Sequence, residues 1–146
     1  MHEKELISNW GEQKSSHNYR RLQSPCAAEF EHIGRLGQLS SYAKVGFAAE
    51  PADTLSLSFD VVWPTDFDDT YKLRIQNTIA EAVADTLLIR NEGTICRGLR
   101  LKLVAFGWSA VGGSEMATYR ATMKAMEQLR EKAKWVDVLG KNRAYV

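Results

Sequence analysis

The sequence predicts an α+β fold: a four-stranded, mainly antiparallel sheet with two helices packed on one face, in the order β-β-β-α-β-α. Three short segments with strand character come first, helical periodicity begins after Pro64, and a fourth strand leads into a long final helix. Placing both helices on one face of the sheet is the simplest arrangement that buries every apolar face. The 146 residues, of which 45% are hydrophobic, suit one globular domain rather than a disordered chain or a disulfide scaffold.

Residues 1–25 are predicted to form a polar N-terminal arm or tail outside the domain. Their apolar side chains follow no clean period, a short helix is expected around residues 3–10, and Pro25 closes the stretch. The folded domain is expected over residues 26–135, and residues 136–146 are expected to form a C-terminal tail.

The first three strands are expected over residues 27–35, 42–49 and 55–63. Strand-breaking residues separate them at 37–41 and 50–53, as in antiparallel hairpins joined by loops of a few residues. In the third segment Leu55, Leu57 and Phe59 alternate with polar side chains. One face of this strand is therefore apolar, and the strand is expected to be half-buried.

The segment after Pro64 is expected to be a helix, because its apolar side chains recur at steps of three and four residues. These side chains are Tyr71, Ile75, Ile79, Ala82, Val83 and Leu87. Asp66, Asp68 and Asp69 stand at its start, where carboxylates favour the positive end of the helix dipole. Gly93 follows as a plausible terminator.

The fourth strand is expected over residues 96–106. Leucines at 99, 101 and 103 share one face, whereas Arg100 and Lys102 lie on the other, so the strand presents positive charge on the open side of the sheet. The final helix then begins with Ser114 as N-cap and Glu115 in the first turn, and it ends near Lys134. Its predicted core stripe is Met116, Tyr119, Met123, Met126, Leu129 and Ala133.

No catalytic, metal or nucleotide site can be assembled from the sequence. His2 and His17 lie in the predicted tail, and His32 has no acidic or cysteine partner at metal-ligand spacing. Cys26 and Cys96 are too far apart for a CxxC motif. No glycine-rich phosphate loop is present. We therefore expect a protein without enzymatic activity, cofactor, metal or nucleotide, in which both cysteines are buried or half-buried thiols.

Charge is distributed unevenly along the chain. Residues 50–92 carry nine acidic and three basic side chains, and residues 93–146 carry ten basic and four acidic ones, although the net charge is only +1. Such a distribution can create one face suited to phosphate. No apolar run approaches the roughly 20 residues of a membrane helix, and no signal peptide is evident, so a cytoplasmic protein without membrane contact is expected.

The segment 96–133 resembles the last strand, tip loop and final helix of domain IV of translation elongation factor G. The most specific match is Ser114-Glu115-Met116-Ala117, followed by Lys124-Ala125 and Lys132-Ala133-Lys134. Upstream, the matching positions are Tyr42, Val45, Glu50, Pro51, Tyr71, Ile79, Glu81, Ala82 and Gly93. The resemblance runs from about residue 27 to about residue 135, and it includes no GTPase domain.

The resemblance implies an unusual left-handed strand-helix-strand crossover and a tip built from two loops. In the factor, this tip reaches the decoding region of the small ribosomal subunit and touches transfer RNA and messenger RNA. By the match, the tip loops here are Gly37, Gln38, Leu39, Ser40 and Ser41, and the segment that contains Gly107, Ser109, Gly112 and Gly113. The residues differ from the family pattern. Leu39, Ser40 and Ser41 stand where the family has a glycine-rich loop, and Ser109 stands where the family has a histidine.

Two functions follow as expectations. The first is a non-catalytic, translation-factor-like binding module that contacts the small ribosomal subunit or other structured RNA. Its candidate RNA-binding residues are Arg35, Lys44, Arg100, Lys102 and Trp108, whose indole can stack on an unpaired base. The alternative is a protein-interaction or homo-oligomerisation domain that uses the open sheet face and has lost RNA binding.

Overall fold

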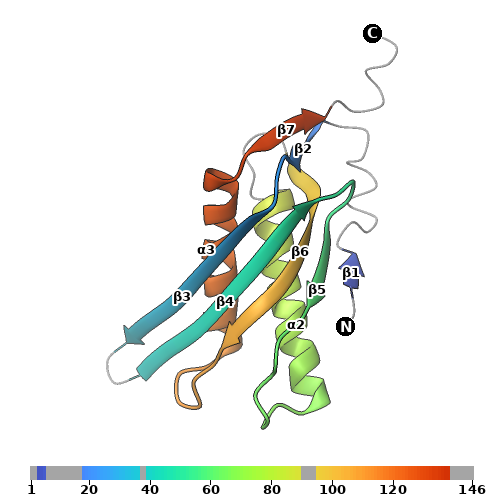
Figure 1. The fold of residues 1–146 in the computed structure, drawn as a ribbon. Coiled ribbons are helices and arrows are strands. Elements are labelled where there is room, and N and C mark those ends of the chain that lie inside the picture. Colours follow the sequence, from blue (N-terminus) through green and yellow to red (C-terminus); the bar gives the residue numbers. More distant parts are fainter. Residues whose placement is uncertain (1–2, 6–17, 37–38, 90–94, 139–146) are drawn as a thin grey trace.

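The computed structural model describes residues 3–5, 18–36, 39–89 and 95–138, and it has the expected α+β fold (Figure 1). The four expected strands are β3 (Cys26–Leu36), β4 (Leu39–Pro51), β5 (Ser56–Phe59) and β6 (Ile95–Gly107). The two expected helices are α2 (Asp69–Ala84), which continues into the π-helical turn η1 (Asp85–Ile89), and α3 (Glu115–Lys132). No helix in the described ranges is both long and apolar enough to cross a membrane.

The four strands lie in the order β3-β4-β6-β5. β4 is antiparallel to both β3 and β6, whereas β5 is parallel to β6. A register shift between Gly46 and Phe47 marks a bulge, so that Gly46 pairs with Ala105 and Phe47 with Leu103. Val104 of β6 therefore has no paired residue on β4 and lies exposed on the open face.

Three further short strands in the described ranges correct the four-strand expectation and the expected boundaries. β2 (Tyr19–Leu22) pairs in parallel with the start of β6 and antiparallel with β7 (Trp135–Val138), so residues 19–22 and 135–138 belong to the sheet rather than to an arm and a tail. Leu22 is 1% exposed. β1 (Glu3–Glu5) pairs with β5, where a short helix was expected; residues 6–10 lie outside the described ranges.

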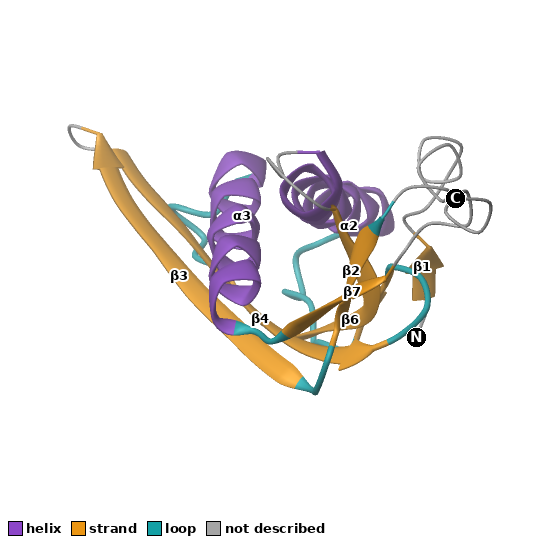
Figure 2. Cartoon of the chain, turned by 90° about the horizontal axis from the view of Figure 1, so that it is seen from above, coloured by secondary structure: helices purple, strands orange, loops and turns teal. Residues whose placement is uncertain are grey.

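Both helices lie on one face of the sheet, as expected, and the other face is open (Figure 2). The apolar side chains between the two layers are almost completely shielded from water. The largest of them are Phe47, Leu22, Leu55, Leu57, Ile75, Ile79, Leu87, Leu99, Leu101, Leu103, Met126 and Leu129. Burial of these side chains is the main favourable contribution to the stability of the fold.

The connection from β5 through α2 to β6 is a left-handed crossover. β5 and β6 run down the page in Figure 1, β6 lies to the left of β5, and α2 lies behind the sheet, as the view from above confirms (Figures 1 and 2). Parallel strand-helix-strand units are right-handed in about 98% of cases. The rare hand that the resemblance implied is therefore present in this chain.

Both helices begin with the predicted caps. The Asp68 carboxylate accepts a hydrogen bond from the amide of Tyr71 at 2.7 Å, and the Ser114 hydroxyl accepts one from the amide of Ala117 at 3.0 Å. The core stripe of α3 differs from the prediction, because small residues let this helix approach its neighbours closely. Its buried residues are Ala117, Thr118, Ala121, Thr122, Ala125, Met126 and Leu129, whereas Met116 is 60% exposed.

Candidate functional site

The second predicted tip loop, residues 107–113, lies against the β3–β4 hairpin at one end of the domain, whereas Leu39, Ser40 and Ser41 of the first predicted loop belong to strand β4. The amide of Tyr42 in β4 donates a hydrogen bond to the carbonyl oxygen of Gly112 at 2.8 Å, and Tyr42 also forms a parallel bridge with Gly113. A methyl group added at Gly107 would lie 2.9 Å from the Cβ of Lys44, which shows how closely the end of β6 approaches β4. The backbone of the second loop thus packs along the β3–β4 hairpin.

Ser109 orders the second loop from within. Its hydroxyl oxygen accepts hydrogen bonds from the amides of Val111 at 3.3 Å and Gly112 at 3.2 Å, and its carbonyl oxygen accepts one from the amide of Gly113 at 2.7 Å. A side-chain hydroxyl that bonds to the backbone two and three residues further on is a common way to stabilise a turn. Ser109 therefore has a structural role in this loop.

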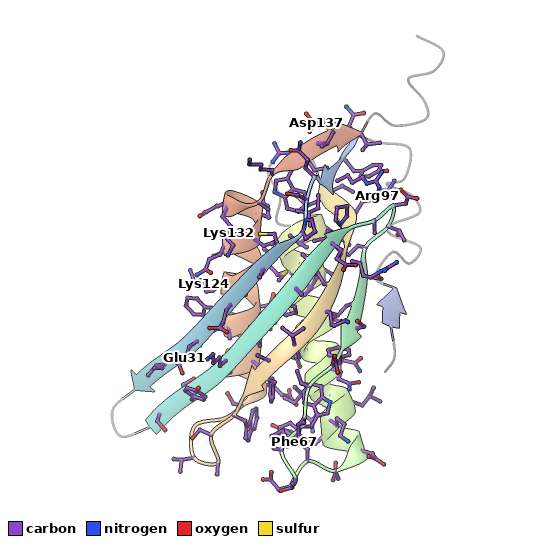
Figure 3. The ribbon with its side chains drawn as sticks, viewed as in Figure 1. Glu31, Phe67, Arg97, Lys124, Lys132 and Asp137 are labelled. Carbon is purple, nitrogen blue, oxygen red and sulfur yellow. The ribbon has the colours of Figure 1, made fainter. Side chains whose placement is uncertain are left out.

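An aromatic cluster supports the tip, and sequence reasoning did not identify it. Its members are Phe59, Trp63, Phe67, Tyr71, Phe106 and Trp108. Phe67 lies at the tip end of the molecule in Figure 3, with ring centroids 4.8 Å from both Tyr71 and Trp108. The four-residue spacing of Trp63, Phe67 and Tyr71 was the available sequence signal.

Trp108, predicted to stack on a base, is half-buried in this cluster. Its ring packs edge-on against Phe67 and stacks with Phe106 at 5.9 Å. Gly113 covers it closely, because a methyl group added there would lie 2.4 Å from its Cε2 atom. Stacking of Trp108 on a base remains a prediction, and the ring already has aromatic neighbours in the fold.

A concavity of about 500 Å³ opens between the two loops. It is lined by Ile33, Gly34, Ser40, Ser41, Tyr42, Trp108 and Ser109, none of which carries a formal charge. The Tyr42 hydroxyl donates a hydrogen bond to Glu31 at 2.7 Å, and this bond, together with burial, raises the pKa of Tyr42 and keeps it neutral. Ile33 is 73% exposed and Val111, in the second loop, is 88% exposed.

His32 in β3 bonds across the hairpin to β4 and lies within electrostatic range of α3. Its Nε2 atom lies 3.1 Å from the Ser41 hydroxyl oxygen. Burial, and secondarily the positive charge of Arg120 in α3, lowers the pKa of His32 below 6.5, so the ring is neutral at physiological pH.

The open sheet face carries both signs of charge. Arg100 lies 3.8 Å from Glu50, and Lys44 lies 3.7 Å from Glu29. A second concavity, of about 440 Å³, is lined by Ala48, Glu50, Ser58, Asp60, Arg100, Lys102 and Val104. The predicted basic strand therefore faces carboxylates from β4 and from the end of β5, which offset its attraction for phosphate.

The structure divides the predicted RNA-binding residues between two places. Lys44 is paired with Gly107 at the tip, whereas Arg100 is paired with Glu50. Arg100 lies seven residues before Gly107 on β6, which places it roughly 23 Å from the tip at 3.3 Å per residue. Lys102 lies between them. Arg35 is paired with Ser40 in the hairpin, its side chain is not described, and Gly37 and Gln38 lie outside the described ranges.

The described part of the tip surface presents hydrogen-bonding groups rather than reactive side chains. Within the described residues no three histidine, cysteine, aspartate or glutamate side chains cluster to hold a metal ion. Cys26 is half-buried and Cys96 is buried, as predicted. The tip presents hydroxyl groups, backbone amides and a few exposed aliphatic side chains, which is the chemistry of a binding surface.

Comparison with known proteins identifies the fold. No protein-family model and no curated protein matches the chain. A crystal structure of a protein from Thermus thermophilus matches 82% of this chain with a TM-score of 0.62 and 18% sequence identity. The match covers only 18% of that chain, so the same fold forms a small part of a much longer protein. At this identity the likeness shows the fold alone.

Proposed function

We propose that this domain is a non-catalytic binding module of the elongation factor G domain IV type, which docks on the small ribosomal subunit by its tip. The observation that carries the proposal is the hydrogen bond from the Tyr42 amide to the Gly112 carbonyl oxygen, which holds the second tip loop against the β3–β4 hairpin. The rare left-handed crossover supports the resemblance from which the proposal comes. The Thermus protein, which carries this fold as a small part of a long chain, is compatible with a multidomain factor.

The tip is suited to contact RNA through shape and hydroxyl groups. Hydroxyl side chains and backbone amides commonly contact phosphate and sugar oxygens, and Ser40, Ser41, Tyr42 and Ser109 line the concavity. Because the last three already bond to His32, to Glu31 and to loop amides, the exposed Ser40 is the hydroxyl best placed for such a contact. Lys44 lies beside this surface and is already paired with Glu29. Because few phosphates would be neutralised, the salt dependence of binding should be weak. The logarithm of the binding constant should fall with the logarithm of the salt concentration by about 0.7 to 0.9 per phosphate contact.

Co-sedimentation with purified small ribosomal subunits at low and moderate salt tests the proposal. Ser40→Glu places a negative charge on the exposed tip, and Gln128→Glu places the same charge on the exposed side of α3 as a matched control. We expect Ser40→Glu to abolish pelleting and Gln128→Glu to leave it unchanged. Absence of pelleting by the native chain at low salt would overturn the proposal.

The alternative, a protein-interaction domain that uses the open sheet face, is favoured by a different observation. Carboxylates of Glu29 and Glu50 pair with the basic residues of that face, and an RNA backbone would be repelled by them. The double variant Arg100→Ala, Lys102→Ala tests which surface contacts the subunit. Loss of subunit binding in this variant, with normal binding of Ser40→Glu, would show that the sheet face, and not the tip, makes the contact.

A further inference from the structure

The outer edge of β3 is long, straight and unpaired in the described part of the chain. β3 pairs with β4 residue for residue, from Cys26 opposite Ala49 to Leu36 opposite Leu39, with no register shift. No described strand pairs with its other edge, and α3 packs against one face of β3 (Figures 1 and 2). An edge of this kind presents backbone amide and carbonyl groups that can pair with another strand.

This edge has only part of the usual protection against such pairing. Proteins protect exposed edges with prolines, bulges or charged side chains; β3 has no proline and no bulge between Cys26 and Leu36, and its charged residues are Glu29, Glu31 and Arg35. Ile33 lies in the distal half of the strand and is 73% exposed. A strand added here would bury an aliphatic side chain that the monomer leaves in water.

We propose that the partner is a second copy of this chain, joined through β3 in an antiparallel pair with Ile33 on the two-fold axis. In this register, position 31 of each copy stands opposite position 35 of the other. Glutamate at 31 and arginine at 35 then make two complementary cross-strand charge pairs on either side of the central isoleucines. The strand is therefore self-complementary in charge.

Neighbouring antiparallel registers are less favourable. Moving the axis to position 32 places each Ile33 opposite a Glu31 carboxylate, and moving it to position 31 places the two Glu31 residues opposite each other. The axis at Ile33 brings together the apolar pair and both opposite-charge pairs. Because β3 projects toward the tip, the bodies of the two copies would extend in opposite directions from the paired hairpins (Figure 1).

Disulfide trapping tests the dimer and its register together. Cysteine is introduced by Ile33→Cys in a chain with Cys26→Ser, and the buried Cys96 is retained. Residues directly opposite in an antiparallel pair have Cα atoms about 4.5 to 5.5 Å apart, within reach of a disulfide. The matched control is Val62→Cys in the same background, because Val62 is 91% exposed and lies outside β3. We expect rapid disulfide-linked dimers for Ile33→Cys and none for Val62→Cys.

Sedimentation equilibrium of the native chain and of charge variants completes the test. Arg35→Glu should weaken the dimer about ten-fold, because it places like charges opposite each other twice, and adding Glu31→Arg should restore it. Restoration in the double variant distinguishes charge pairing from general damage to β3. A native chain that stays monomeric, or equal cross-linking of Ile33→Cys and Val62→Cys, would overturn the proposal. Loss of the dimer in both Arg35→Glu and the double variant would overturn this register.

Discussion

The amide of Tyr42 donates a hydrogen bond to the carbonyl oxygen of Gly112, 2.8 Å away, and so connects strand β4 to a loop about seventy residues later in the sequence. The same contact fixes the position of the Ser109 turn, whose hydroxyl bonds to the amide of Gly112. The tip is therefore an ordered part of the fold, and changes within it should affect stability as well as binding.

Gly113→Ala should destabilise the domain by about 1 to 3 kcal/mol, the usual cost of overpacking. The added methyl group would lie 2.4 Å from the Trp108 ring and 2.6 Å from the Ser109 carbonyl oxygen, so ring and backbone must both move. Urea unfolding measures the loss. Gly34→Ala is the control, because its nearest neighbour is the His32 ring at 3.2 Å, and it should cost clearly less. Equal losses in the two variants would contradict the close packing of the loop.

Gly98→Ala should separate β2 from β6. A methyl group at this position would lie 2.6 Å from the Cα of Arg21, and backbone cannot yield as a flexible side chain does. We expect faster amide hydrogen exchange over residues 19–22 and a lower free energy of unfolding. Gly46→Ala, whose closest neighbour is the Ala105 methyl group at 3.1 Å, should leave exchange in β2 unchanged. Unchanged exchange in Gly98→Ala would show that β2 is not held against β6 as described.

Trp108→Ala should lower the free energy of unfolding by about 3 kcal/mol, the low end for removing a packed aromatic ring, because this ring is half-buried. It loses contacts with Phe67, Phe106 and Tyr71. Val111→Ala, in the same loop and 88% exposed, should change stability by less than about 0.5 kcal/mol. If both variants were equally stable, Trp108 would be a free surface side chain rather than part of the cluster.

Acidification should destabilise the domain through His32. Its pKa in the fold is lowered below the ordinary value of 6.5 by burial and by Arg120, so the unfolded chain takes up the proton first as the pH falls. The free energy of unfolding is therefore unaffected by this group above pH 6.5 and decreases as the pH falls from 6.5 toward the folded pKa. His32→Gln should show a smaller decrease between about pH 7 and 5 in urea titrations. Parallel pH profiles for the two proteins would exclude this role.

The long elements could be predicted because their periodicity is strong. Two of the added strands could not, because β2 and β7 have only four residues each and exist by pairing with each other and with β6. The buried face of α3 was misjudged for a physical reason: methionine is more hydrophobic than alanine or threonine, and close approach of the helix selects small residues such as Ala121 and Thr122.

The candidate site was less predictable than the fold. Arg100 and Lys102 were correctly placed on one face of a strand, but the carboxylate of Glu50 beside them depends on the register between β4 and β6, which periodicity does not determine. The pairing of the tip loops followed only from the resemblance. The aromatic cluster joins two stretches of the chain, residues 59–71 and 106–108, so only the packed structure brings it together.

Docking by the tip is most directly tested by the difference in small-subunit co-sedimentation between Ser40→Glu and the Arg100→Ala, Lys102→Ala double variant, each compared with the native chain. The account predicts that Ser40→Glu stays in the supernatant while the double variant pellets as the native chain does. The account would be contradicted if Ser40→Glu pelleted while the double variant stayed in the supernatant, or if the native chain did not pellet.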